Sequence, residues 1–255
     1  MGRIGYHTAG SAVIGYQMGL DITSNNLANV NTAGFKASRA DFADLIYTVR
    51  NNNIREVQTG HGVKVDKTTL MFDQGVMKQT ERKLDFAAMG EGFFAVRSAR
   101  DDEVRYTKDG AFYIYVEDGT LRDSNGGYVL DYNGDIINVP YKIDKSVPYD
   151  ENEEEEPVYT EEVDYDALAK MIGVYRFPNP YGVDQVGLNY FEATPSSGEP
   201  EAAPDAVKKQ GYLELSSTSI SNEMAEVIEY QRAFQLNTNV LKIHDELEQK
   251  INSLR

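Results

Sequence analysis

The sequence predicts an α+β fold in which long α-helices near the N- and C-terminal ends pair as a coiled coil, with an antiparallel β-rich domain inserted between them. Near both ends of the chain, apolar residues recur at alternating intervals of four and three residues. That spacing is the seam of a coiled coil, whose helices contact each other every 3.5 residues on average. Between the ends, apolar residues alternate with polar ones, and Asp-Gly and Asn-Gly pairs punctuate the chain, which is typical of antiparallel hairpins.

These patterns divide the chain of 255 residues into three segments. Residues 1–59 are expected to hold the N-terminal helix and a linker, and residues 216–255 the C-terminal helix, so that both belong to one helical assembly domain. Residues 60–215 are expected to form the β-rich middle domain, which carries an acidic loop at residues 150–166. A chain of this length can form one or two domains with a buried core.

The C-terminal segment is predicted to be one uninterrupted helix. No glycine follows Gly211 and no proline follows Pro204, so nothing breaks a helix between Ser219 and Leu254. At 1.5 Å per residue this helix would be about 54 Å long, and its apolar seam needs a partner. The seam, which slips once, comprises Ile220, Met224, Val227, Gln231, Phe234, Thr238 and Leu241, followed by Val240, His244, Leu247, Ile251 and Leu254.

The N-terminal segment offers that partner, although two ordinary amphipathic helices on one core are the alternative. Each glycine in it costs a helix about 1 kcal/mol relative to alanine, so we expect it to become ordered only against a partner. Its seam residues are Ala9, Val13, Tyr16, Leu20, Thr23, Leu27 and Val30. From both seams together we expect the helices to bury Leu20, Leu27, Met224, Val227, Phe234 and Leu241.

The middle of the chain is predicted to form short strands. Val63 and Val65 alternate with charged residues, and the aromatic and β-branched run Phe112–Val116 precedes the turn signal Asp118-Gly119. Ahead of this region, residues 41–47 are expected to continue a helical pattern, and the asparagines at 51–53 to form a loop tip.

Composition excludes several classes of function. A net charge of −16 argues against nucleic acid and against charge-driven binding to an anionic membrane. The absence of cysteine excludes disulfides, thiol catalysis and cysteine-ligated metals. Between Asp150 and Asp166, ten residues are acidic and none is Lys or Arg. Such a block repels itself and is expected to be a solvated loop; a metal site is the alternative.

No catalytic, cofactor-binding or metal-binding site is expected from the motifs. His7, His61 and His244 lack the paired spacing of a zinc site. The segment Asp131–Asp135 is similar to a calcium loop, but its glycine stands at the fourth position instead of the sixth, so we expect a β-turn. The stretch Ile4–Leu20 contains four glycines and makes a poor signal-peptide core. No run reaches the length of a transmembrane helix.

An asparagine-rich stretch closes the N-terminal helix. Asn25, Asn26, Asn29 and Asn31 lie within seven residues, and Gly34 follows as a candidate helix cap. Asparagine competes for backbone hydrogen bonds inside a helix. We therefore interpret the stretch as a helix end whose amides bond to neighbouring backbones, with a polar loop as the alternative.

This stretch, from Asn25 to Lys36, resembles the N-terminal signature of bacterial flagellar rod and hook proteins. Near the other end, Glu223-Met224, Ile228 and Gln231–Asn237 resemble the C-terminal signature of the same family. The signature residues are Asn25, Asn26, Leu27, Ala28, Asn29, Gly34, Phe35, Gln231, Arg232, Ala233 and Asn237. The middle resembles the longer rod proteins at Gly75, Leu84-Asp85, Gly90–Phe94, Tyr106–Phe112, Asp118–Leu121, Gly187–Phe191 and Gly211–Glu214.

Two departures from the family pattern leave the position within the rod open. Ser216–Ser219 stands where the family usually has Ser-Asn-Val-Asn, and Lys108 stands where arginine is frequent. Another rod paralogue of similar length or a short hook protein is therefore the alternative within the family. A cell-wall-binding or peptidoglycan-cleaving β domain is the alternative from a different class.

The resemblance implies a non-enzymatic structural subunit that assembles helically into the distal rod, the drive shaft between motor and hook. Its partners would be further copies of itself, other rod proteins, the hook and the flagellar export apparatus, without nucleic acid, cofactor or small-molecule substrate. It would lie in the basal body beyond the inner membrane after type III export, with no cleaved signal peptide. The expected assembly interface comprises Ala9, Val13, Tyr16, Leu20, Leu27, Val30, Met224, Val227, Gln231, Phe234, Leu241, Leu247 and Ile251.

Overall fold

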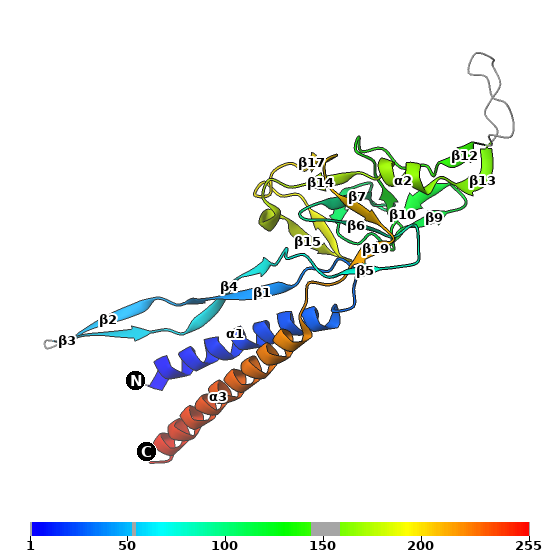
Figure 1. Ribbon diagram of the computed structural model, residues 1–255. Helices are drawn as coiled ribbons and strands as arrows, with labels where there is room; N and C mark the ends of the chain where they lie inside the picture. The colour runs from blue at the N-terminus through cyan, green and yellow to red at the C-terminus, as the bar shows by residue number, and fades with distance from the viewer. Residues whose placement is uncertain (1, 53–54, 144–158, 255) are drawn as a thin grey trace. The chain divides into compact units, whose positions relative to one another are not determined.

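The computed structural model describes residues 2–52, 55–143 and 159–254 and confirms the α+β class (Figure 1). A long helix lies near each end of the chain, and the paired strands between them are antiparallel. The chain forms two compact units. The helical unit contains the residues up to Val30, Lys36–Met71 and the chain from Thr218. The β unit contains Asn31–Phe35 and Phe72–Ser217.

The helical unit consists of two helices and four strands. The helices are α1 (Gly2–Ala28) and α3 (Ile220–Ser253). Strand β1 (Ser38–Asp44) pairs with β4 (Val63–Leu70), and β2 (Tyr47–Asn52) pairs with β3 (Arg55–Gly60).

The prediction that residues 41–47 continue a helix is wrong, because β1 occupies most of this segment. Its register places Asp41 opposite Lys67 and Phe42 opposite Val65, with a shift of the register between Asp41 and Phe42. Asp41 also accepts a hydrogen bond from the Thr69 hydroxyl. Pairing with β4 thus overrides the short apolar spacing that favoured a helix. The strands consequently begin at Ser38, whereas the sequence predicted them from residue 60. Of the expected loop tip at 51–53, residues 51 and 52 lie in β2 and residue 53 lies outside the described residues.

The β unit is built on a nine-stranded antiparallel sheet. Its main path runs in the order β15-β16-β8-β7-β11-β10-β9, with β14 also pairing with β7, and β17 with β14. The strands of this sheet are β7 (Phe93–Arg97), β8 (Val104–Thr107), β9 (Tyr113–Tyr115), β10 (Thr120–Arg122), β11 (Tyr128–Val129), β14 (Val174–Arg176), β15 (Asp184–Gly187), β16 (Tyr190–Glu192) and β17 (Glu201–Ala202).

Smaller strand pairs and two short helices complete the β unit. The helices are α2 (Tyr165–Met171) and the 3-10 helix η1 (Pro180–Gly182). The strand pairs are β5 (Met77–Gln79) with β19 (Tyr212–Glu214), β6 (Phe86–Ala88) with β18 (Lys208–Gln210), and β12 (Tyr141–Ile143) with β13 (Tyr159–Val163).

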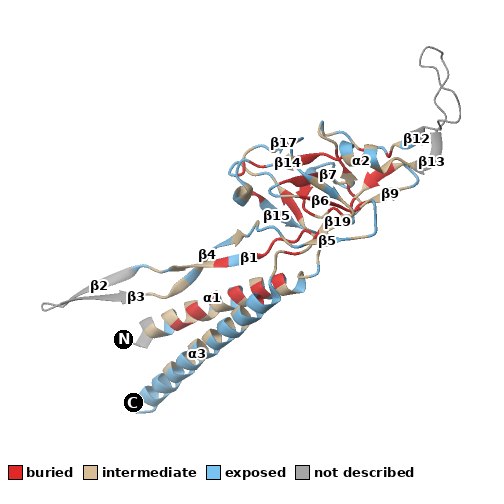
Figure 2. Ribbon diagram, viewed as in Figure 1, coloured by how far each residue is buried: buried red, intermediate tan, exposed pale blue. Residues whose placement is uncertain are grey.

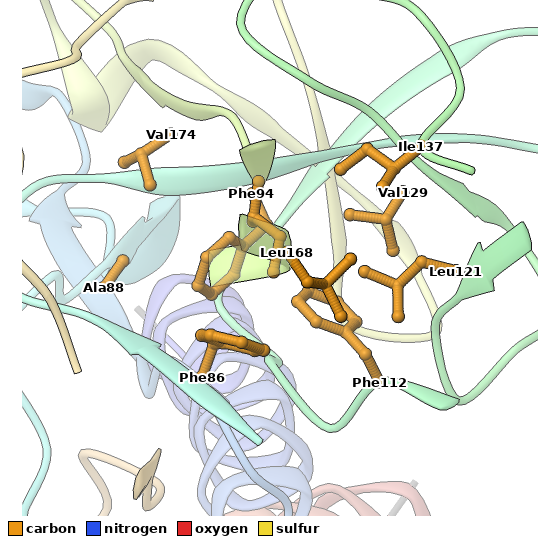
Figure 3. Packing of buried hydrophobic residues seen from close by; sticks show 10 residues of the cluster. Phe86, Ala88, Phe94, Phe112, Leu121, Val129, Ile137, Leu168 and Val174 are labelled. Atoms are coloured by element: carbon orange, nitrogen blue, oxygen red, sulfur yellow. The ribbon is translucent and has the colours of Figure 1, made fainter. Parts of the chain in front are cut away.

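A fully buried apolar cluster forms the core of the β unit (Figure 3). Phe94 and Phe112 meet edge to face, with ring centroids 5.2 Å apart. Leu121 and Val129 join them from the sheet, and Leu168 packs in from α2. Each of these side chains is at most 1% exposed, so this unit has a core of its own.

The turns predicted from sequence are confirmed at two places in the β unit. Asp118-Gly119 connects β9 to β10, and Gly119 has a φ of +63°, as a tight hairpin requires. In the segment Asp131–Asp135, the Asp131 carboxylate accepts hydrogen bonds from the backbone N–H groups of Asn133 and Asp135. This carboxylate therefore closes a β-turn, as predicted.

The predicted acidic loop lies only partly within the described residues. Residues 150–158 fall outside them. The remainder is not a loop, because residues 159–163 form β13 and Asp164 caps α2. The Asp164 carboxylate accepts hydrogen bonds from the backbone N–H groups of Asp166 and Ala167. An acid at the N-cap satisfies the free amides of the first turn, so local capping overrides the charge repulsion that predicted a loop.

Candidate assembly interface

Helices α1 and α3 run antiparallel and in contact within the helical unit (Figure 1). A Cβ at Gly5 would lie 2.8 Å from His244 Nε2, and a Cβ at Gly19 would lie 3.2 Å from Tyr230 Cε2. The Asn26 amide donates a hydrogen bond to the Glu223 carboxylate at 3.1 Å. Along α1 these contacts are 14 residues and then 7 residues apart, as they also are along α3. The register therefore repeats in multiples of seven.

The face of α1 that is buried consists of small and polar side chains (Figure 2). Its members are Ala9, Ala12, Gly15, Gly19, Thr23 and Asn26. The expected burial of Leu20 and Leu27 is met only halfway, because both are half-buried, as are Val13, Tyr16 and Val30. Residues without bulky side chains let the neighbouring backbones and rings approach closely, so the large residues of the predicted seam lie at the flanks of the contact.

Helix α3 is exposed or half-buried along its length, except at Glu223. Its half-buried row includes Val227, Tyr230, Phe234, Leu241 and His244. The expected burial of Val227, Phe234 and Leu241 is thus met only halfway. For Met224 it is wrong, because 53% of this residue is exposed. The row that faces α1 starts at Glu223, one position before Met224. The predicted stripe, which starts from Ile220 and Met224, is therefore rotated partly away from α1.

Three aromatic rings connect both helices to β1. The ring centroids of Tyr16 and Phe42 are 5.7 Å apart, those of Tyr16 and Tyr230 6.3 Å, and those of Phe42 and Tyr230 6.0 Å. A Cβ at Gly15 would lie 3.5 Å from the Phe42 ring. Phe42 and Tyr230 were absent from the predicted interface; Phe42 was assigned to a helix, and Tyr230 lies between two positions of the predicted seam.

Asn26 connects three elements of the helical unit. Its amide Nδ2 donates to the carbonyl of Ser38 at 2.8 Å, and its Oδ1 accepts from the backbone N–H of Ser38 at 2.9 Å. The same Nδ2 also donates to Glu223. The interpretation of this signature as a helix end whose amides bond to neighbouring backbones is confirmed at Asn26. Burial raises the pKa of the Glu223 carboxyl, against the effect of the Asn26 hydrogen bond.

The next part of the same signature belongs to the β unit. The Gly34 N–H donates to the carbonyl of Glu214 at 2.8 Å, and the Asn189 amide donates to the carbonyl of Ala33 at 2.8 Å. Gly34 has a φ of +68°, and a Cβ there would lie 2.4 Å from the carbonyl carbon of Lys108. Only glycine fits this conformation and this space. The signature thus contributes contacts inside both units.

The other signature residues lie at different depths. Phe35 is buried in the β unit, whereas Asn25 and Ala28 are exposed on α1. The half-buried Asn29 donates to the carbonyl of Asn25 at 2.9 Å. On α3, Gln231 and Arg232 are exposed, and the half-buried Asn237 donates to the carbonyl of half-buried Ala233 at 2.8 Å.

Both helices carry large apolar side chains that their own unit does not cover. Figure 2 shows that α3 is exposed along most of its length. On α3, the exposed apolar residues recur at intervals of three and four over most of the helix. We call this set the outer stripe; it comprises Ile220, Met224, Ile228, Leu236, Val240, Ile243, Leu247, Ile251 and Leu254. On α1, Tyr6, Ile14 and Met18 are likewise exposed.

Among the described residues, no group of three or more His, Asp or Glu side chains could hold a metal ion. Likewise, no helix in the described ranges is long and apolar enough to cross a membrane.

Three family models match this chain at its two helices and in the β unit. The description "Flagella basal body rod protein" matches residues 7–36, and "Flagellar basal body rod FlgEFG protein C-terminal" matches residues 209–254. The description "Flagellar hook protein FlgE/F/G D1 domain" matches residues 87–149. The two rod models thus cover both signatures.

Similar proteins match over nearly the full chain. The flagellar basal-body rod protein FlgG of Borreliella burgdorferi is 33% identical over 97% of this chain and 97% of its own length. FlgG of Bacillus subtilis is 30% identical over 96% of each chain. The flagellar hook protein FlgE of Helicobacter mustelae is 39% identical, but over 47% of this chain and 28% of its own length.

Proposed function

The chain belongs to the family of flagellar basal-body rod proteins and is a structural rod subunit, and from this premise we propose that it self-assembles through the outer stripe of α3 into the distal rod. The relatives reported above that match nearly the whole chain are named FlgG, whereas the hook protein matches less than half of it. That difference supports a rod position over a hook position.

The observation that carries this proposal is the exposure of the outer stripe. A single chain leaves Leu236 66%, Ile243 56% and Leu247 51% exposed. Burying a side chain of this size is worth roughly 1.5–3 kcal/mol. Large exposed apolar side chains gathered along one helix indicate an interaction site, and helices of neighbouring copies are the partner that their helical spacing fits.

We further propose that α1 and α3 pair as a coiled coil and that this pair is the part of the chain that assembles. The register of the α1–α3 contacts, which repeats every seven residues or multiples of seven, supports the coiled coil. In this proposal the α3 residues of the predicted interface divide into two sets. Val227, Phe234 and Leu241 hold the two helices of one chain together, whereas Met224, Gln231, Leu247 and Ile251 contact neighbouring copies.

The remaining proposals concern partners and place. Family membership supports a subunit that contacts other rod proteins and the hook, has no catalytic activity, and lies in the basal body beyond the inner membrane. It also supports delivery by the flagellar export apparatus without cleavage of a signal peptide. We propose the three-part division at residues 59/60 and 215/216 as the division between the parts that assemble and the middle domain. The compact units differ from it in that β4 lies with the helices and residues 31–35 lie in the β unit.

The test compares two adjacent substitutions on α3. Leu236→Asp introduces a charge into the outer stripe, whereas Gln235→Asp introduces the same charge at an exposed polar position one residue earlier. We expect cells that carry Leu236→Asp to lose motility and basal bodies to lack this subunit, while Gln235→Asp assembles normally. Secretion and folding of both variants would be verified by mass spectrometry and circular dichroism. Normal rods with Leu236→Asp would contradict the assignment of the stripe.

A further inference from the structure

A cavity in the β unit is lined in part by a lysine side chain. The cavity has a volume of ≈ 650 Å³ and is lined by Lys208 together with Tyr132, Asp166, Ala169 and Lys170. Lys208 reaches it from β18, where it pairs with Ala88 of β6. A small molecule therefore has room beside this amine.

The ammonium group of Lys208 is held at a defined position. Its Nζ donates a hydrogen bond to the carbonyl of Ile172 at 2.6 Å and lies 4.9 Å from the centre of the Tyr132 ring. Ile172 is the C-cap of α2. One N–H bond is thus directed at a fixed acceptor, which leaves the lone pair of the neutral amine free to point elsewhere.

Burial makes the neutral amine accessible near physiological pH. The half-buried position lowers the pKa of Lys208 to about 8, with burial as the cause. The other titratable groups of the cavity lining are Tyr132, Asp166 and Lys170, and Asp205 acts on Tyr132. At pH 7.5 roughly a quarter of such an amine is unprotonated, against roughly one part in a thousand for an ordinary lysine. Only the unprotonated amine is a nucleophile.

We propose that Lys208 is an acylation site that takes the acyl group of a small acyl phosphate entering this cavity. The amine nitrogen attacks the carbonyl carbon, the bond from that carbon to the phosphate oxygen breaks, and phosphate leaves with the electron pair. The surplus amine proton passes to water. The amide product keeps one N–H for the Ile172 carbonyl but loses the positive charge. Lys170 supplies a second cation in the same lining for the departing phosphate.

The first experiment uses the unmodified full-length chain. It would be incubated with acetyl phosphate between pH 7 and pH 9, and the acetylated fraction of every lysine would be followed by peptide mass spectrometry. Lys209 is the matched comparison, because it is the next residue of the same strand and is exposed. We expect Lys208 to react at least several-fold faster than Lys209 at pH 7.5. Equal or slower reaction of Lys208 would overturn the proposal.

A second experiment tests whether the charge of the amine governs the site. Ala169→Glu places a carboxylate in the same cavity and would favour the charged ammonium, whereas Ala169→Gln adds the same bulk without charge. We expect the acetylation rate of Lys208 in Ala169→Glu to be several-fold below that in Ala169→Gln, with Lys209 unchanged. Equal rates in the two variants would contradict control by the ammonium charge. Lys208→Arg, which should lose this one label, verifies the peptide assignment.

Discussion

The two compact units bury their apolar residues to different extents. In the β unit, Phe86, Phe94 and Phe112 are completely buried. In the helical unit, the 34-residue helix α3 buries only Glu223 among its described residues, while Leu236 and Ile243 are mostly exposed. The β unit therefore has the core that stabilises a domain by itself, whereas the helical unit leaves large apolar side chains exposed in the single chain.

Because the two units differ in apolar burial, we expect the β unit to stabilise the monomer and the helical unit to mediate assembly. Removing one large side chain from a core of packed phenylalanines lowers the free energy of unfolding by several kcal/mol, because the surrounding structure relaxes only partly into the cavity that remains. An exposed leucine contributes little to the stability of a single chain. It stabilises a complex when a partner removes it from water. Substitutions in the two units should consequently affect different measurements: unfolding of the monomer for the β unit, and assembly for the outer stripe.

The largest effect on the monomer is expected from Phe94→Ala in the β unit. Phe94 is completely buried and contacts Phe112 edge to face. Removing a buried phenylalanine costs about 3–5 kcal/mol, so the midpoint of urea unfolding should fall markedly. The control is Leu247→Ala on the outer stripe, for which we expect almost no change in the same measurement. Similar losses for both variants would remove the distinction between the units.

Gly34→Ala is expected to have the next largest effect. The left-handed conformation costs alanine about 1–3 kcal/mol, and the new Cβ would collide with the Lys108 carbonyl carbon. Gly119→Ala is the matched control, because Gly119 has a similar φ of +63° with no atom within 4 Å of a Cβ. The difference between the two variants in thermal unfolding isolates the collision. If the two midpoints coincide, the signature loop does not require glycine for its space.

Phe234→Asp should have a smaller effect on the monomer and should affect only the helical unit. Phe234 is half-buried on the side of α3 that faces α1. A charge there should loosen the helix pair by about 1–3 kcal/mol and prevent assembly, while the β unit stays folded. Hydrogen exchange would show faster exchange of amides in residues 9–28 and unchanged exchange in β7 and β8. Unaltered exchange in α1 together with normal motility would contradict the role of this seam.

Both long helices were predictable from sequence, because apolar residues recur at helical intervals near both ends of the chain and, for α3, because glycine and proline are absent after Gly211. The buried face of α1 was predicted in part: Ala9 and Thr23 of the predicted seam are buried, whereas Gly15 and Gly19 were missed, because they carry no apolar side chain for the pattern to register. They are nevertheless the positions where Phe42 and Tyr230 pack. A small residue makes a close contact only where a ring from another element packs against it. Phe42 and Tyr230 are distant from Gly15 and Gly19 in the sequence, so a local pattern does not reveal these contacts.

The strands of the helical unit could not be found locally either. Residues 38–44 form β1 because β4 pairs with them, and the paired residues lie 19 to 32 positions apart in the sequence. By contrast, the asparagines of the signature were interpreted correctly at Asn26, because a buried amide at a helix end must bond to nearby backbone. The cavity beside Lys208 forms where β18, α2 and the Tyr132 ring come together. No sequence motif indicates that these three parts lie side by side, so the cavity could not be predicted.

The smallest expected effect concerns the one buried residue of α3, Glu223. Burial raises the pKa of its carboxyl above the ordinary 4.5, so the folded state binds a proton more tightly than the unfolded state. The free energy of unfolding therefore falls as the pH rises from 4.5 through the raised pKa, and the loss persists at neutral pH.

Glu223→Gln removes this loss while an amide oxygen can still accept from Asn26. At pH 7 we expect slightly slower hydrogen exchange in α1 and α3 than in the parent chain, and no difference at pH 4. Glu229→Gln, at an exposed position one turn and a half further along α3, should change neither; a gain for Glu223→Gln that persists at pH 4 would show that packing of the amide, not ionisation, is its source.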